Sequence, residues 1–317
     1  MRAVRMTAPR VMELIEMPDP VPKKGEVLVR LTEVAICGSD LVAYLATLPR
    51  EFPDMEGRPA HECVGIVEKS DMEGFEVGDR VLYFPPGQNG LRQYGIASTP
   101  DRMLKLPADG DISEWMMAQL LGTVLHGLRS VGEVMSENVA IVGQGPVGQL
   151  FNHMMWNLGA KSVIGIDRVP ERLEVSPRMH ATHTILSDNA ADAVPKVQEL
   201  TDGLGADVVV EASGYDEAIN IAYSAVRRDG RLLQFGAPKF ASQQFAVRNI
   251  YDKRLKITST IGPELERDIH QALRYIIDGR VNVKPIITHR FPLDRVHEAY
   301  EVYAERQRGC VKVIVEL

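Results

Sequence analysis

Two short segments in the first third of the chain carry side chains that bind transition metals. Cys37 lies in the sequence CGSD (37–40), and His61 and Glu62 end the sequence PAHE (59–62). A thiolate, an imidazole and a carboxylate are suitable zinc ligands, and a catalytic zinc keeps one position open for water or substrate. Either segment alone says little, because a single Cys at a strand end is usually a small buried hydrophobic residue. Together they make a candidate site for one zinc ion.

A glycine-rich turn near the middle of the chain is typical of dinucleotide binding. The sequence GQGPVG (143–148) follows a short apolar strand and opens a helix-like stretch. The first glycine of such a motif allows a tight turn, the second lets the backbone approach a pyrophosphate, and the third permits close helix–strand packing. Free N–H groups at the helix N-terminus attract the phosphates. The cofactor-binding candidates here are Gly143, Gly145, Pro146, Val147 and Gly148.

A carboxylate follows this turn at a position that bears on the choice of cofactor. Asp167 ends the next apolar strand, near the distance of ~20 residues at which an acidic residue binds the ribose hydroxyls. A carboxylate there favours the free ribose diol of NAD over the 2′-phosphate of NADP. Arg168 could attract that phosphate or flank the adenine. We expect NAD rather than NADP, with Arg168 and Arg172 as further cofactor-binding residues.

The elements around the glycine turn predict a doubly wound α/β unit. Short apolar strands alternate with helix-like stretches, and near-continuous apolar strands of this kind form a parallel sheet covered on both faces. Six such strands fit a Rossmann sheet that binds a dinucleotide. The predicted strands are VAIVG (139–143), SVIGID (162–167), HTILS (183–187), ADVVVEAS (206–213), GRLLQFG (230–236) and LKITST (255–260).

The two ends of the chain have a different pattern. The first 110 residues contain short segments rich in Val, Ile and Leu that are broken by Gly, Pro and Asp, which indicates β-structure. The tail, 263–317, does not continue the α/β alternation, so we expect it to return to the N-terminal part. The expected domains are therefore a mostly β domain of residues 1–119 and 263–317, and a dinucleotide-binding domain of residues 120–262.

Composition narrows the classes of function. The 317 residues are 45% hydrophobic and 25% charged, with a net charge of −7. This balance is typical of a globular protein, not a disordered one, and it argues against a nucleic-acid partner, which favours a basic face. No apolar run approaches the ~20 residues of a membrane helix. Three scattered cysteines and an N-terminus without an apolar core favour a cytoplasmic protein without a disulfide framework.

The motifs, in this order, resemble the medium-chain zinc-dependent alcohol dehydrogenase superfamily along essentially the whole chain. The resemblance implies a GroES-like catalytic domain built from both chain ends, a nicotinamide cofactor domain between them, an active site in the cleft, and a homodimer or homotetramer. Besides CGSD and PAHE, it rests on CVGIVE (63–68), FEVGDRV (75–81), VAIVGQGPVGQL (139–150), GADVVVEASG (205–214) and VKVIVEL (311–317).

Within that superfamily the resemblance assigns roles to single residues. Cys37 and His61 fall on the first two zinc ligands, and Glu62 follows the His as in the sorbitol and sugar dehydrogenase branch, where it ligates zinc or supports it. Gln119 stands where that branch has a carboxylate, and its amide oxygen could bind zinc weakly or hydrogen-bond a zinc-bound water. Ser39 is expected to accept the proton of the substrate hydroxyl.

Departures from the pattern sharpen these expectations. The cysteine-rich lobe that holds a structural zinc is absent, since LYFPPGQNGLRQYG (82–95) contains no Cys, so we expect one zinc per subunit. Val42 replaces the proton-relay His of simple alcohol dehydrogenases, so the proton must leave Ser39 by another route, such as water. Ala60 replaces the usual Gly before the ligand His.

The resulting expectation is a zinc-dependent oxidoreductase that transfers hydride between NAD and a secondary alcohol of a polyol, sugar or cyclitol-like substrate. Two alternatives stay open at this point. One is an NADPH-dependent enone or quinone reductase of the same superfamily, which needs no metal. The other is a relative that binds dinucleotide without turning a substrate over.

Overall fold

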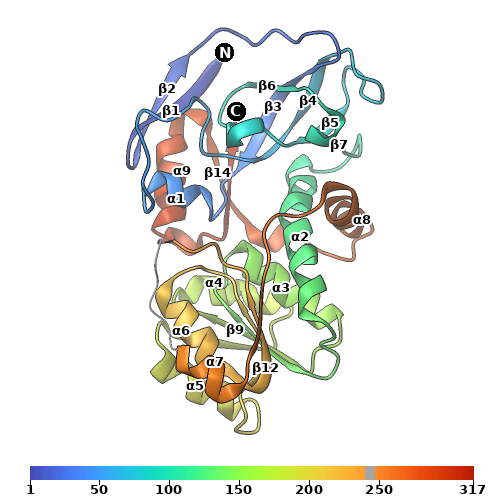
Figure 1. Ribbon diagram of the computed structural model, residues 1–317. Coiled ribbons are helices and arrows are strands. Elements are labelled where there is room, and N and C mark those ends of the chain that lie inside the picture. Colours follow the sequence, from blue (N-terminus) through green and yellow to red (C-terminus); the bar gives the residue numbers. More distant parts are fainter. Residues whose placement is uncertain (240–246) are drawn as a thin grey trace.

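The computed structural model describes residues 1–239 and 247–317, apart from the side chain of Gln307. Figure 1 shows two lobes stacked along the long axis of the molecule. The upper lobe is rich in strands and contains both chain ends, whereas the lower lobe alternates strands and helices. Helix α2 (Ile112–Val131) lies between the lobes.

The upper lobe joins the two ends of the chain in one sheet. Its described strands run in the order β14-β15-β3-β4-β5-β7, with β6 also paired to β3. Strand β15 lies antiparallel to β3, with Ile314 opposite Ala35, which confirms the expected return of the tail. A hairpin of β1 (Arg2–Ala8) and β2 (Val11–Glu16) lies beside it, with α1 (Asp40–Tyr44) and α9 (Val296–Ala304). The sheet strands are β3 (Val27–Ala35), β4 (Glu62–Ser70), β5 (Arg80–Tyr83), β6 (Tyr94–Ala97), β7 (Met103–Lys105), β14 (Ile287–Pro292) and β15 (Lys312–Glu316).

The lower lobe has the doubly wound topology predicted from the alternating pattern. Its described strands run β10-β9-β8-β11-β12-β13, and all of these pairs are parallel. The order reverses between β8 and β11, and ligands of such sheets bind at that crevice, beyond the carboxyl ends of the strands. The strands are β8 (Asn138–Val142), β9 (Ser162–Asp167), β10 (His183–Leu186), β11 (Ala206–Glu211), β12 (Val226–Gln234) and β13 (Lys256–Ser259); the helices are α3 (Pro146–Asn157), α4 (Pro170–Val175), α5 (Ala190–Glu199), α6 (Asp216–Ala225) and α7 (Val247–Lys253).

Helix α2 contributes to both lobes. Asp111 caps its N-terminus, because the side chain accepts a hydrogen bond from the Ser113 N–H at 2.9 Å. The helix packs against β4 and β5 of the upper sheet and against α3 and β12 of the lower lobe. It runs without interruption through residues 119 and 120, so the division of the domains at that point stays a prediction. Helix α8 (His270–Ile277) packs alongside it.

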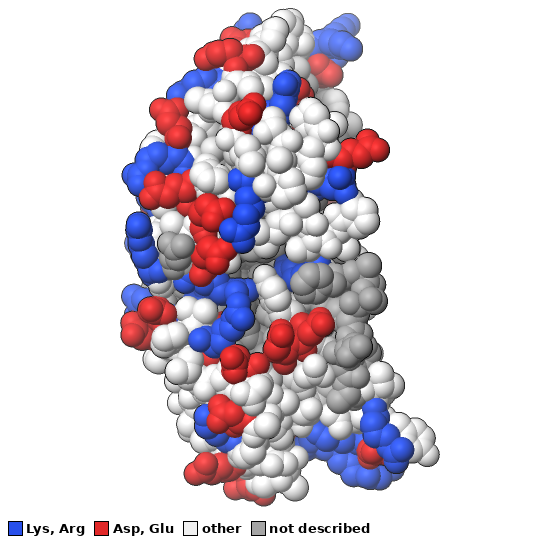
Figure 2. All heavy atoms as spheres, turned by 90° about the vertical axis from the view of Figure 1, so that its left-hand side faces the viewer, with Lys and Arg blue, Asp and Glu red and all other residues white. Residues whose placement is uncertain are grey.

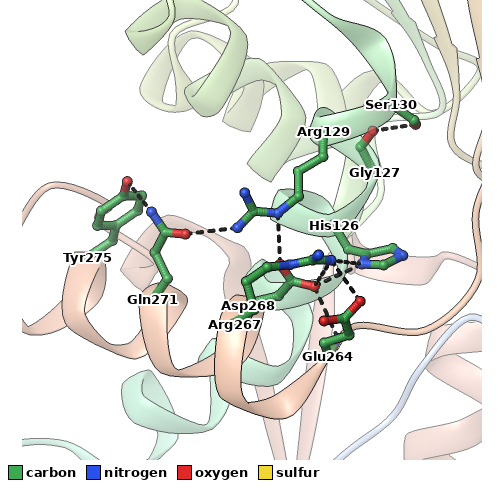
Figure 3. A network of polar contacts seen from close by, with 9 residues as sticks. All are labelled: His126, Gly127, Arg129, Ser130, Glu264, Arg267, Asp268, Gln271 and Tyr275. Atoms are coloured by element: carbon green, nitrogen blue, oxygen red, sulfur yellow. Dashed lines mark hydrogen bonds and ion pairs between the residues drawn. The ribbon is translucent and has the colours of Figure 1, made fainter.

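A buried carboxylate fastens the turn before α8 to α2 (Figure 3). Asp268 is fully buried and accepts hydrogen bonds from His126 Nδ1 at 2.8 Å, Arg129 Nε at 3.0 Å, Arg267 Nε at 3.0 Å and the Glu264 N–H at 3.0 Å. Burial alone would raise the pKa of Asp268, but these hydrogen bonds outweigh it and hold the pKa well below its usual value. His126 is thus part of a helix–helix contact.

Basic and acidic side chains are interspersed on the face of the molecule seen in Figure 2. Ion pairs also join elements that are distant in sequence: Arg10 of the hairpin turn lies 3.1 Å from Glu301 and 2.6 Å from Glu305, near the end of α9. Among the described residues, no helix is both long and apolar enough to span a bilayer.

Candidate active site and cofactor cleft

Three of the four predicted metal ligands come together at neighbouring strands of the upper sheet. Cys37 follows the end of β3, while His61 and Glu62 stand at the start of β4. These strands are antiparallel and Ala35 pairs with Glu62, so the two segments meet although they are separate in sequence. One donor atom of each residue lies within 4.8 Å of the other two. This spacing suits a single metal ion that touches all three.

Asp40 contacts two members of this cluster, Cys37 and His61, a role that the sequence did not reveal. It is 2% exposed, and its Oδ2 accepts a hydrogen bond from the Cys37 N–H at 2.8 Å. Its Oδ1 lies 3.2 Å from His61 Nδ1, the arrangement by which a carboxylate orients a metal-binding imidazole. Burial lowers the pKa of His61, but the charges of Asp40 and Cys37 outweigh this and raise it well above its usual value. The surroundings of His61 therefore favour a positive charge at the ring, either a second proton or a bound metal ion.

A second residue missed from the sequence, Lys312 of β15, pairs with Glu62. Both side chains are fully buried, and Lys312 Nζ lies 2.8 Å from Oε1 and 2.7 Å from Oε2 of the carboxylate. Only Oε1 receives a hydrogen bond of good geometry; Oε2 has none from the part of the chain that the structure describes. The oxygen Oε2 thus keeps a lone pair available. A Lys within the apolar run VKVIV was the one local signal for this pair.

Gln119 and Ser39 differ in their surroundings. Gln119, on α2, is 8% exposed, and its Oε1 is buried without a hydrogen-bond partner among residues 1–239 and 247–317. The next residue, Leu120, lines the same cleft as Cys37. Ser39 is exposed and precedes α1, but its hydroxyl caps no N–H of that helix. Its Oγ is therefore not committed to the helix end.

The donor set fits zinc. The donor atoms of Cys37, His61 and Glu62 lie within 4.8 Å of one another, the carboxylate has an oxygen without a hydrogen bond from the described residues, and Asp40 orients the imidazole. Three protein ligands with an open fourth position are the pattern of catalytic zinc sites. Gln119, the fourth predicted ligand, is not among the residues that line this cleft, so its part in holding a metal or a water stays a prediction.

The glycine turn and Cys37 of the metal cluster line one cleft between the lobes. Cys37, Gly38, Leu41 and Leu120 line it at one end, and the turn and the end of β9 line it further along. Gly145 is the N-cap residue of α3, and no side chain caps this end of the helix. The first N–H groups of the helix are therefore free to bind an anion. A Cβ at Gly148 would overlap the carbonyl oxygen of Gly143, so the third glycine is required for packing. Pro146, Val147, Asp167, Arg168 and Arg172 also line the cleft.

The residues after β9 are placed in different ways. Asp167 accepts hydrogen bonds from the Gln144 N–H at 2.6 Å and the Val169 N–H at 2.9 Å, which hold its carboxylate against the glycine turn. Arg168 is exposed. Arg172 is 8% exposed and its Nε donates to the Cys310 carbonyl of the upper lobe at 2.8 Å, while its Nη1 stands 3.7 Å from the place of a Cβ on Gly145. Its remaining N–H groups thus face the turn.

Comparisons with known proteins agree with this arrangement. Residues 23–119 match the alcohol dehydrogenase GroES-like domain, and residues 146–278 match the zinc-binding dehydrogenase domain. Sorbitol dehydrogenase 1 of Saccharomyces cerevisiae is 30% identical over 88% of this chain and 87% of its own length. Sorbitol dehydrogenase of Bacillus subtilis is 27% identical over 99% of this chain and 97% of its own. The solved structure of alcohol dehydrogenase TADH from Thermus sp. ATN1 superposes with a TM-score of 0.86 over the whole of both chains, at 25% identity.

The chain belongs to the zinc-dependent medium-chain alcohol dehydrogenase family. It is accordingly an oxidoreductase that acts on CH–OH groups with zinc and a nicotinamide cofactor.

Proposed function

We propose that this enzyme oxidises a secondary hydroxyl of a polyol, sugar or cyclitol-like substrate in the cytoplasm, with one zinc per subunit and NAD as hydride acceptor. The observation that carries the proposal is the convergence of Cys37, His61 and Glu62 at one end of a cleft whose other part is a dinucleotide turn. The sorbitol dehydrogenases among its relatives support the substrate class. A metal-free enone reductase would have no use for these three donors.

The residues at this end of the cleft have different roles in the proposed reaction. The bound zinc supplies a Lewis acid and the nicotinamide accepts the hydride. Cys37, His61 and Glu62 would hold the metal, and Asp40 keeps the His61 ring in place. Ser39 Oγ takes the proton of the substrate hydroxyl and passes it to water or to a second hydroxyl of the substrate, because Val42 cannot carry it further. The apolar side chains of Leu41 and Leu120 line that end of the cleft and keep water from the reacting carbon.

Metal analysis of protein purified without chelators tests the zinc site. We expect about one zinc per chain, because the described donors form one such site and no cysteine-rich lobe is present. Cys37→Ala should lose the metal and the activity. Cys63→Ala is the matched control, since Cys63 is a buried cysteine of β4 that is not part of the donor set, and it should keep both. Two zinc ions per chain, or full activity without metal, would contradict the proposal.

The carboxylate at the end of β9 should set the preference for NAD. In Asp167→Ser the ratio of kcat/KM for NAD to that for NADP should fall, because the repelling charge is gone while Arg168 remains beside the ribose site. Asp167 also supports the glycine turn through the Gln144 N–H. Asp167→Asn keeps an oxygen for that hydrogen bond without the charge, so it should shift the ratio in the same direction. A wild-type enzyme that prefers NADP would refute the prediction.

We also propose a homodimer or homotetramer that uses the edge of the lower sheet. The last strand, β13, is exposed at all four positions and pairs only with β12 among the described strands, and such an edge is a template for pairing. Light scattering should show a multiple of the 35.2 kDa chain mass. Ile257→Lys, on β13, should shift the population toward the monomer, whereas Val77→Lys, on the upper lobe, should not. A 35 kDa wild-type particle at micromolar concentration would refute the assembly.

A further inference from the structure

Lys239 is a buried cation for which the metal cluster and the glycine turn give no role. It follows β12, is 6% exposed and lines the cleft between the lobes. Its Nζ donates to the carbonyl oxygen of Gly38, in the upper lobe, at 3.0 Å. An ammonium has three N–H groups, and this is the one hydrogen bond that it makes within the described residues. No described carboxylate lies within ion-pair distance, although a buried charge is costly without a partner.

The backbone of Lys239 lies beside the phosphate-binding turn. Its N–H donates to the Gly214 carbonyl at 3.2 Å. A Cβ placed on Gly143, the first glycine of the turn, would stand 3.0 Å from Cβ of Ser213, which precedes Gly214. The side chain therefore begins next to the glycine turn and ends next to the loop of Cys37. Because the glycine turn, Lys239 and Cys37 line the same cleft, a dinucleotide that reaches from the turn to Cys37 would pass close to this side chain.

A second cation from the opposite lobe reaches the same place. Arg306, just after α9, has its Cζ 4.8 Å from the centre of the Tyr215 ring, and Lys239 Nζ lies 5.9 Å from the centre of that same ring. Arg306 makes no ion pair with a carboxylate in the described part of the chain, and it too lines the cleft. Two cations that share one aromatic ring and lack a carboxylate partner form a site for an anion.

Space is available for that anion. Gly38 carries no side chain, and among the described residues a Cβ there would meet only the Tyr303 hydroxyl, at 3.9 Å. Burial lowers the pKa of Lys239, against the raising effect of the charges on Cys37 and Glu211. An additional anion beside the ammonium would stabilise its charged form.

We propose that the Lys239 ammonium and the Arg306 guanidinium bind the diphosphate of the dinucleotide, in addition to the backbone of the glycine turn. The inference rests on the proposed use of a nicotinamide dinucleotide and adds residues that bind it. The turn supplies backbone N–H groups from the lower lobe, whereas Lys239 and Arg306 supply the positive charge. Because Lys239 also holds Gly38, a bound diphosphate would be contacted by a residue that joins the two lobes.

Equilibrium binding to the zinc-loaded enzyme tests the proposal without turnover. Isothermal titration with ADP-ribose, which has the diphosphate but no nicotinamide, should give a Kd that is about 10- to 100-fold higher in Lys239→Gln than in wild type, as expected for loss of a charge-assisted hydrogen bond. Arg306→Gln should weaken binding in the same direction. Lys239→Arg should retain most of the affinity. Adenosine, which lacks phosphate, should bind all these proteins equally.

The control is Lys161→Gln, which removes an exposed lysine that pairs with Asp202 away from the cleft and should bind ADP-ribose as wild type does. Zinc content and thermal midpoint show whether each variant is folded. Unchanged ADP-ribose affinity in Lys239→Gln would overturn this inference but not the proposed function. This holds even if the KM of the alcohol rises, because the lysine would then recognise the substrate and not the diphosphate. A wild-type enzyme that binds neither NADH nor ADP-ribose would overturn the proposed function as well.

Discussion

Replacing Ser39 with alanine should lower kcat by about 10²- to 10⁴-fold, the range for a positioned acid–base group. The hydroxyl follows Cys37, a proposed zinc ligand, by two positions and caps no helix N–H, so it is free to take the proton of the substrate hydroxyl. Ser39→Thr keeps a hydroxyl and should retain most of the activity. Zinc content and the Kd of NADH should stay close to wild type in both variants. Full activity in Ser39→Ala would refute the assigned role.

The same relay has a consequence for the range of substrates. Val42 offers no group to which Ser39 could pass the proton, and a neighbouring hydroxyl of a polyol can serve instead. Polyols and cyclitols should therefore have higher kcat/KM values than ethanol and other short primary alcohols in a panel with NAD. Preferred oxidation of simple primary alcohols would show that the substrate class is wrong even if Ser39 is essential.

Removing the buried ammonium of Lys312 should destabilise the metal-free protein by about 3–5 kcal/mol, the cost of leaving one member of a buried ion pair alone. Lys312→Met leaves the Glu62 carboxylate fully buried without its counter-charge. The thermal midpoint should fall by several degrees, measured by calorimetry or circular dichroism. In the double variant Lys312→Met/Glu62→Gln the midpoint should recover most of the loss, because no unpaired charge remains.

A comparison of the metal-free with the zinc-loaded variant distinguishes two possible roles of Glu62. If the carboxylate binds the metal, zinc supplies a positive charge in place of Lys312, and the metal-loaded Lys312→Met protein should regain part of its lost stability. Equal destabilisation with and without zinc would show that Glu62 belongs to the ion pair and not to the metal. A Lys312→Met protein as stable as wild type in the metal-free state would contradict the prediction itself.

The alternating strands and helices of the lower lobe and the position of its glycine turn could be predicted because their signals are local. An apolar strand followed by GQGPVG and then by the strand that ends in Asp167 occupies a short stretch of sequence, and each residue type has a direct steric or electrostatic reason. The candidate metal ligands were predicted from their residue types and from a resemblance, and the structure shows that the pairing of β3 with β4 brings Cys37, His61 and Glu62 together.

The residues that support the site could not be found in this way, because their roles depend on contacts between distant segments. Asp40 is close to Cys37 in sequence, yet its contact with His61 exists only once β4 is in place. Lys312 reaches Glu62 because the chain end returns to the upper sheet. Lys239 meets Gly38 only across the cleft. A charged residue in a short apolar stretch, such as Lys312, is a signal that a partner exists but does not say which one.

The cluster around Asp268 bears on how the cleft can open. Helix α2 belongs to both lobes, and the buried carboxylate holds the turn before α8 against it through His126 and Arg129. In Figure 1 helices α2 and α8 lie on one side of the boundary between the two lobes. We expect the cleft to open by a rotation about an axis near α2, which keeps this contact in place. Such a rotation separates the lobes and breaks the contacts that cross the cleft, of Lys239 with Gly38 and of Arg172 with Cys310.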